Sequence, residues 1–248
     1  MMYKDTLPSS EPTRRTLIKR AAGLSILGIA GVMSVGIPSL SYAAAMTREA
    51  RDKLTPDEII EGLKQGNIRF HSGKAHQHNY LAQKRSSAAG QFPSAVILSC
   101  IDSRAPAEII LDTGIGEAFN SRIAGNIAND DILGSLEFAC AAAGAKVILV
   151  MGHTACGAVK GAIDNVQLGH LTGLLDKIKP AIDKTEYTKE RTSSNDEFVD
   201  AVARTNVKLT MDEIRKSDIL NKLESDGKLK IVGSMYDLAA GKVEFFTE

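Results

Sequence analysis

Two short apolar runs decide the fold: Ala95-Val96-Ile97-Leu98-Ser99 and Lys146-Val147-Ile148-Leu149-Val150-Met151. Neither run alternates apolar with polar residues, so each predicts a strand that is covered on both faces, as in a parallel sheet. Further strands are expected at 118–122, 231–236 and 243–246, with a turn at Ala240-Gly241 between the last two.

Helical patterns separate these strands. Thr55 suits a helix N-cap, with Pro56 in the first turn and Glu58 completing a capping box. Other helices are expected at 106–111, at 131–143, after Cys156, and at 196–223. Strands that alternate with helices predict an α/β fold, with a mainly parallel central β-sheet flanked by helices. No repeat or linker divides residues 46–248, so we expect one domain there.

The first 45 residues are typical of a signal peptide. Residues 13–20 are basic and contain the pair Arg14-Arg15, residues 21–40 are small or apolar, and 41–45 read Ser-Tyr-Ala-Ala-Ala. This order resembles a twin-arginine signal with an A-x-A-like cleavage site. The alternative is a membrane anchor, but the glycines and Pro38 in the apolar stretch favour removal. We therefore expect an exported protein, periplasmic or extracellular, without a stable membrane anchor after cleavage.

Charge and cysteine content exclude some classes of protein. The chain has 248 residues, in which 30 Lys and Arg balance 30 Asp and Glu, so net charge gives no reason to expect a nucleic-acid partner. Its three cysteines are too few, and odd in number, for a disulfide scaffold. Cysteine is therefore expected to bind a metal or take part in chemistry.

Three histidines lie close together in sequence, at His71, His76 and His78. Such a group suggests a metal site, but Gly73, Lys74 and other polar neighbours are typical of a solvated loop, which we favour.

A stronger metal signal follows the two buried strands. Cys100 closes the first apolar run, while His153 and Cys156 follow the second. Ligands of α/β sheets bind beyond the carboxyl ends of the strands, and two thiolates with an imidazole are donors that zinc prefers. Three protein ligands leave a fourth position open, which is typical of catalytic zinc. The alternatives are buried structural cysteines, the reading adopted for Cys140, and a redox pair, for which Cys100 and Cys156 are far apart.

The two segments resemble the signature of β-carbonic anhydrases: Cys-x-Asp-x-Arg at 100–104 and His-x-x-Cys-Gly at 153–157. The resemblance continues through 119–126, 135–139, 159–162 and 236–243. It implies one Zn²⁺ per chain, held by Cys100, His153 and Cys156, and a catalytic dyad of Asp102 and Arg104. It also implies reversible hydration of carbon dioxide to bicarbonate and a proton, in a homodimer or homotetramer.

The chemistry agrees with these roles. Zinc supplies hydroxide near neutral pH by acidifying bound water, although two thiolates reduce that effect, so activity should rise above pH 7. Ionised Asp102 only accepts hydrogen bonds and so can orient the hydroxide, while Arg104 keeps Asp102 ionised.

The resemblance also implies substrate-pocket residues. In the plant-like type, Gln91 and Phe119 match pocket positions, Phe138 replaces a tyrosine, and the Gly157 amide is expected near substrate. The bicarbonate-regulated type uses a tryptophan, which this chain lacks. Two other functions stay open: hydrolysis of carbon disulfide or carbonyl sulfide on the same scaffold, and zinc binding without catalysis. The intact Asp102–Arg104 pair disfavours the second.

Overall fold

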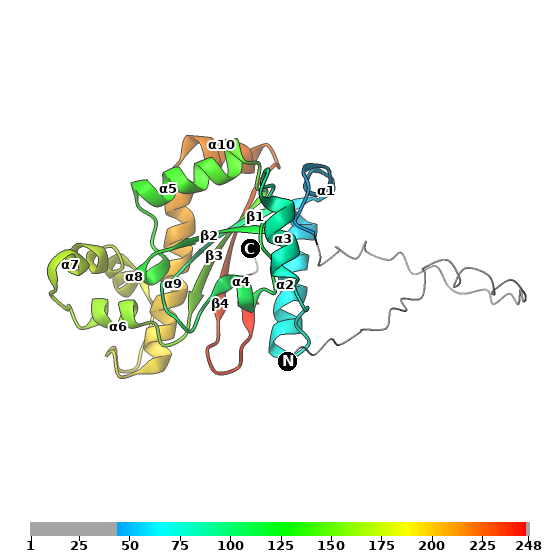
Figure 1. Cartoon of the computed structure of the whole chain (residues 1–248). Coiled ribbons are helices and arrows are strands. Elements are labelled where there is room, and N and C mark those ends of the chain that lie inside the picture. Colours follow the sequence, from blue (N-terminus) through cyan, green and yellow to red (C-terminus); the bar gives the residue numbers. More distant parts are fainter. Residues whose placement is uncertain (1–43, 247–248) are drawn as a thin grey trace, which may run out of the picture. The chain divides into compact units, whose positions relative to one another are not determined.

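The computed structural model describes residues 44–246, which belong to the unit that spans Leu40–Glu248 (Figure 1). The predicted signal peptide, apart from Ala44 and Ala45, is outside the described residues. Within the described part of the chain, every helix is too short or too polar to span a bilayer.

A five-stranded sheet with the order β2-β1-β3-β4-β5 forms the centre of this unit. The first four strands in this order pair in parallel, and β5 pairs antiparallel to β4 at the edge. This confirms the predicted α/β fold with a mainly parallel sheet. The strands are β1 Ala95–Ser99, β2 Ala118–Arg122, β3 Val147–His153, β4 Lys230–Tyr236 and β5 Val243–Phe245.

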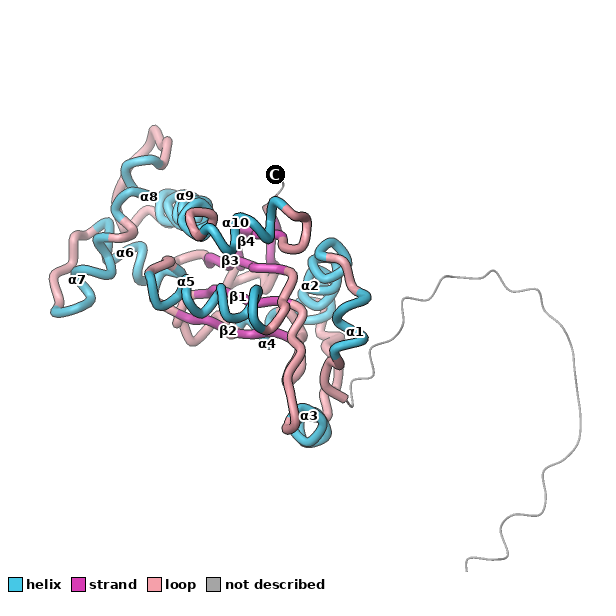
Figure 2. The backbone as a smooth tube through the Cα atoms, turned by 90° about the horizontal axis from the view of Figure 1, so that it is seen from above, coloured by secondary structure: helices cyan, strands magenta, loops and turns pink. Residues whose placement is uncertain are grey.

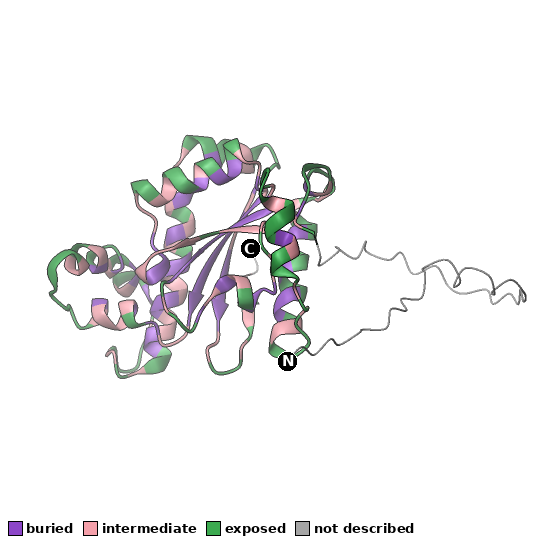
Figure 3. Cartoon of the chain, viewed as in Figure 1, coloured by how far each residue is buried: buried purple, intermediate pink, exposed green. Residues whose placement is uncertain are grey.

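Helices cover both faces of the sheet (Figures 1 and 2). Val96, Leu98 and Ile148 point into one core cluster with residues of the long helix α9, whereas Ile97 and Leu149 point into a second cluster with residues of α2 and α4. Every residue of β1 and β3 is buried (Figure 3), which explains why their sequences show no alternation.

The helices are α1 Arg48–Lys53, α2 Pro56–His71, α3 Tyr80–Ser87, α4 Ala107–Ile110, α5 Asp130–Glu137, α6 Gly157–Ile163, α7 Gly169–Asp176, α8 Lys179–Lys184, α9 Asp196–Ile214 and α10 Asp218–Ser225. A short 3₁₀ helix, η1, spans Ala124–Asn126, and a π-helical turn, η2, spans Phe138–Ala142. The capping box predicted at the start of α2 is present, with Thr55 and Glu58 bonding each other's backbone N–H groups.

The single helix predicted for 196–223 is wrong, because the chain breaks after α9 and restarts as α10. Ser217 marks the new start: as the N-cap of α10, its hydroxyl accepts a hydrogen bond from the Leu220 amide, and it donates one to Glu137 at 2.6 Å. An N-cap inside the predicted helical stretch therefore begins a second helix.

The predicted solvated loop around the three histidines also needs correction. His71 is the exposed last residue of α2, but the His76 and His78 rings turn inward onto Asp112, at 2.8 and 3.0 Å, and the side chain of Asp112 is 2 % exposed. Arg69 binds the same carboxylate through its Nε. A buried carboxylate needs such partners, so these histidines hold the loop onto the end of α4.

The strand order fixes where a ligand can bind. After β1 the chain crosses to β2 on one side, and then returns to form β3 on the other side of β1. Such a reversal opens a crevice beyond the carboxyl ends of the two central strands. Because Ser99 of β1 pairs with Met151 of β3, Cys100 and His153 both reach that crevice.

Candidate metal centre

Three buried donors converge at the carboxyl ends of β1 and β3. The ligand atoms of Cys100, His153 and Cys156 all lie within 4.8 Å of one another, and the residues are 4 %, 1 % and 1 % exposed. Cys100 directly follows β1, and Cys156 is the residue before α6. The sequence suggested that His153 follows the strand, but His153 is the last residue of β3 itself.

The imidazole of His153 is oriented for metal binding. Its Nδ1 lies 2.9 Å from the backbone carbonyl of Thr154, which favours a proton on that nitrogen. The lone pair of Nε2 then faces the cluster. Nε2 is buried and has no hydrogen-bond partner among the described residues. A buried, unpartnered nitrogen of this kind fits a metal ligand.

The two thiols shift each other's pKa in opposite directions. A hydrogen bond from the Cys156 thiol lowers the pKa of Cys100 well below its usual range, and the Gly125 amide, 3.3 Å from Cys100 Sγ, acts in the same direction. The bonded Cys100 in turn raises the pKa of Cys156. A dication would remove the remaining proton, because coordinating thiols are deprotonated. The donor set therefore fits zinc.

Two glycines let the backbone approach this cluster. Gly125 has a φ of +69°, and a Cβ there would lie 2.6 Å from Ile178. A Cβ at Gly152 would lie 2.7 Å from Val207 of α9. A side chain at Gly125 would push the loop after β2 away from Ile178, and one at Gly152 would push the end of β3 away from α9.

Asp102 and Arg104 form an ion pair with two side-chain hydrogen bonds beside the cluster. Arg104 donates Nε to Asp102 Oδ1 at 3.0 Å and Nη2 to Oδ2 at 2.7 Å. These hydrogen bonds lower the pKa of Asp102 to about 2. Asp102 Oδ2 lies 3.9 Å from His153 Nε2. The ionised carboxylate of Asp102 is thus held next to the three candidate metal ligands.

Arg122 is a residue to which the sequence interpretation gave no role. From the end of β2 it donates Nε to the Cys100 carbonyl at 2.8 Å and Nη2 to the Asp102 carbonyl at 2.6 Å. It therefore shapes the loop that carries both residues. The signal available in sequence was only that an arginine ends the strand expected at 118–122.

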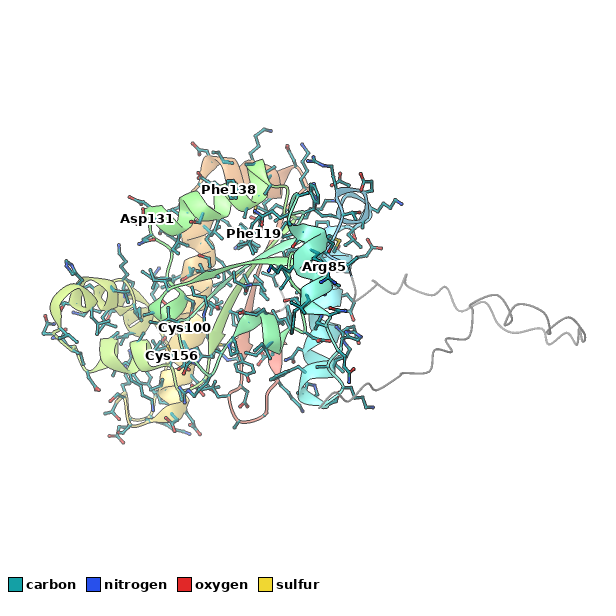
Figure 4. The ribbon with its side chains drawn as sticks, viewed as in Figure 1. Arg85, Cys100, Phe119, Asp131, Phe138 and Cys156 are labelled. Carbon is teal, nitrogen blue, oxygen red and sulfur yellow. The ribbon has the colours of Figure 1, made fainter. Side chains whose placement is uncertain are left out.

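The predicted pocket residues Phe119 and Phe138 do not join the cluster within one chain. Their rings pack together 6.1 Å apart and line a hollow with Val96 and Asp131. Phe119 pairs with Val96, four residues before Cys100, which places it roughly 13 Å away along the strand direction at about 3.3 Å per residue. Figure 4 shows both phenylalanines well apart from Cys100 and Cys156.

Gln91 and Gly157 are also separate. Gln91 is exposed, precedes the amino end of β1 and lines a second hollow with Gly90 and Ile115. Gly157 is exposed beside Cys156, and a Cβ there would meet no described atom within 4 Å. Of the four predicted pocket residues, Gly157 alone lies beside the cluster.

Comparison with known proteins agrees with this geometry. Residues 95–243 match the carbonic anhydrase family. Carbonic anhydrase 2 of Mycobacterium tuberculosis is 34% identical over 193 residues, covering 75% of this chain and 91% of that protein. The carbonic anhydrase of Mycolicibacterium smegmatis is 34% identical over 195 residues, covering 76% and 92%.

Solved structures show the same fold. A tetrameric β-carbonic anhydrase of Sordaria macrospora superposes with a TM-score of 0.60 at 24% identity, covering 77% of this chain and 98% of that one. The β-carbonic anhydrase CcaA gives a TM-score of 0.61 at 23% identity, covering 77% and 94%. The chain belongs to the carbonic anhydrase family, in its β class. The family predicted from the two sequence motifs is confirmed.

Proposed function

We propose that this chain catalyses the reversible hydration of carbon dioxide to bicarbonate and a proton, with one zinc ion held by Cys100, His153 and Cys156. The observation that carries the proposal is the convergence of these three donors next to the ionised Asp102. Zinc in such a site acidifies bound water and supplies hydroxide near neutral pH.

The role proposed for Asp102 follows from its contacts. Both carboxylate oxygens accept hydrogen bonds from Arg104, so the group is fixed in direction and stays ionised. An ionised carboxylate accepts a hydrogen bond from the attacking hydroxide and donates none. Asp102 would therefore orient the hydroxide that zinc supplies, and Arg104 holds Asp102 in place.

The positions of Gln91, Phe119 and Phe138 support a site shared between two copies of the chain. These residues lie toward the amino ends of β1 and β2, whereas the donors lie at the carboxyl ends. Phe138 is 56% exposed although its ring packs against that of Phe119. A second copy that presents this apolar surface to the donor cluster would supply the pocket that an uncharged substrate requires. The tetrameric assembly of the Sordaria relative agrees with a homo-oligomer.

We also propose that residues 1–45 export the protein by the twin-arginine route, so that it acts in the periplasm or outside the cell. The support is the order of the basic segment with Arg14-Arg15, the apolar stretch and the small residues at 41–45. Cell fractionation of the full chain and of an Arg14→Lys, Arg15→Lys variant tests this. Export of both proteins alike would contradict it.

The test of the activity is stopped-flow carbon dioxide hydration by protein of known metal content. We expect a rate that depends on zinc, is lost on chelation and returns when zinc is restored. A folded, zinc-loaded protein that does not exceed the buffer rate would overturn the proposal.

A further inference from the structure

Two side chains of α9 hold the backbone of both cysteine-bearing regions, although neither side chain belongs to the donor cluster. Asp200 Oδ1 accepts a hydrogen bond of 2.9 Å from the amide of Ala155, the residue before Cys156. Asn206 Nδ2 donates a bond of 2.7 Å to the carbonyl of Gly125. The amide of Gly125 in turn donates to Cys100 Sγ.

The turn that carries Cys156 needs such support. Ala155 has a φ of +52°, in the left-handed region that an alanine rarely adopts. Strain of this kind persists only where the surroundings fix it. On one side, the Thr154 amide donates to the Tyr236 carbonyl at the end of β4, and the Leu238 amide donates to the Thr154 hydroxyl. On the other side, Asp200 fixes the Ala155 amide.

The loop that faces Cys100 is fixed in a matching way. Gly125 has a left-handed φ and presents its amide to the sulfur. Asn206, which is 3 % exposed, binds the carbonyl of the same residue. The two bonds hold Gly125 through both of its peptide groups, so Asn206 restrains the residue whose amide is directed at Cys100.

The helix that carries both side chains is itself fixed on the sheet. Val207 of α9 packs where Gly152 and Gly233 leave room for it. Asp200 and Asn206 are six residues apart, a rise of about 9 Å along a helix. One rigid element therefore spans the distance between the two cysteine-bearing regions.

We propose that Asp200 and Asn206 are positioning residues that set, from one helix, the spacing of Cys100 and Cys156 around the metal. This rests on the proposed zinc chemistry and extends it to residues that do not touch the ion. Partners that orient metal ligands change metal affinity by roughly 10–100-fold when they are removed.

Zinc affinity, measured by competition with a chelator, and the sulfur-to-metal charge-transfer absorption of the cobalt-substituted full chain test the proposal. We expect Asp200→Ala, which removes the acceptor, to weaken zinc binding roughly 10–100-fold and to shift the cobalt spectrum. Asp200→Asn keeps a side-chain oxygen and should stay closer to the native protein in both measurements. Asn206→Ala should behave like Asp200→Ala.

Two control variants separate positioning from general effects. Asp212→Asn removes an exposed charge from the same helix, and Asn221→Ala removes a similar side chain-to-carbonyl bond, to Arg215, from another helix. Both should bind zinc as the native protein does. If they weaken binding as much as Asp200→Ala, the proposal is overturned.

The outcome is decisive even if one variant is unstable. Asn206 is buried, so its replacement risks unfolding, which circular dichroism would detect. Asp200 is partly exposed. If the Asn206 variant unfolds, the two Asp200 variants decide the question. Native zinc affinity and an unchanged cobalt spectrum in folded Asp200→Ala would overturn the proposal. A native chain that binds no zinc would instead overturn the proposed function, and this inference with it.

Discussion

Arg104 binds the carboxylate of Asp102 through two hydrogen bonds, Nε to Oδ1 at 3.0 Å and Nη2 to Oδ2 at 2.7 Å. The Arg104 amide also donates to Oδ1, at 2.9 Å. Two-point binding of a carboxylate fixes its plane as well as its charge. Arg104 is 57% exposed on its side chain, so an ordinary surface ion pair at this position would contribute little to stability. The pair is therefore better explained by the orientation of Asp102 than by stability.

Replacement of Asp102 by Asn should separate metal binding from catalysis. The variant keeps all three donors, so we expect native zinc content, but its amide has a different hydrogen-bonding pattern and no charge. Carbon dioxide hydration should fall roughly 100-fold or more, as measured by stopped flow. Asp183→Asn, an exposed carboxylate on α8, is the control. Equal rates in the native and Asp102→Asn proteins would remove Asp102 from the mechanism.

Replacement of Arg104 by Met should change the titration of Asp102. Hydrogen bonds from Arg104 hold the pKa of Asp102 at about 2, so the carboxylate is ionised near neutral pH. Without Arg104 its pKa should return toward about 4, the ordinary value for aspartate. Carbon-13 NMR of the carboxyl groups measures this directly. An Asp102 that still titrates near its native pKa in Arg104→Met would show that other groups hold the charge.

Subunit complementation tests the shared site. A chain with Cys100→Ser and Cys156→Ser lacks the metal but keeps Phe119 and Phe138, and a chain with Phe119→Ala and Phe138→Ala has the reverse defect. After subunit exchange, mixed oligomers should contain sites with both intact donors and intact phenylalanines. Activity should therefore exceed the sum of the two separate proteins. A mixture no more active than its components, with exchange verified by mass spectrometry, would place the pocket within one chain.

The buried carboxylate of Asp112 should make the stability of the fold depend on pH. Burial alone would raise the pKa of Asp112, but bonds from Arg69, from the His76 amide and from His78 outweigh it, and the pKa is lowered. A lowered carboxyl pKa stabilises the fold above the unfolded-state value of about 4, and this stability is lost as pH falls through the folded-state pKa. Burial lowers the pKa of His76, so His76 adds stability that is present above about pH 6.5 and is lost on acidification.

Urea unfolding of Asp112→Asn measures how much the Asp112 carboxylate contributes to stability. Loss of bonds to a charged, buried acceptor should reduce the free energy of unfolding by about 2–3 kcal/mol at pH 7. Stability of the variant should also fall less steeply with pH than that of the native chain between about pH 5 and pH 3. Parallel pH profiles for the two proteins would rule out Asp112 as the source.

Sequence predicted the fold well where hydrophobic patterns repeat locally. The runs that became β1 and β3, the capping box at Thr55 and the turn at Ala240-Gly241 depend on neighbours in the chain, and all four are present. The break between α9 and α10 was not predicted, because Ser217 bonds to Glu137, 80 residues away. The inward-turned His76 and His78 were missed for the same reason, since their partner Asp112 is distant in sequence.

Some residues of the site were predicted from sequence and others were not, for similar reasons. The three donors follow from motifs at strand ends, and the parallel register brings them together. The residues that hold the loops, Arg122, Asp200 and Asn206, act through backbone atoms of distant segments, and no spacing rule identifies such contacts. Phe119 and Phe138 matched a family pattern in sequence, but one chain places them at the opposite end of the strands from the donors.

The most direct test of the account is the coordination of the metal in the purified full-length protein. Elemental analysis combined with zinc X-ray absorption should give one zinc per chain with two sulfur neighbours at about 2.3 Å and one imidazole nitrogen at about 2.0–2.1 Å. The fourth neighbour should be a light atom. A folded, metal-free protein, or a zinc ion without sulfur neighbours, would contradict the account.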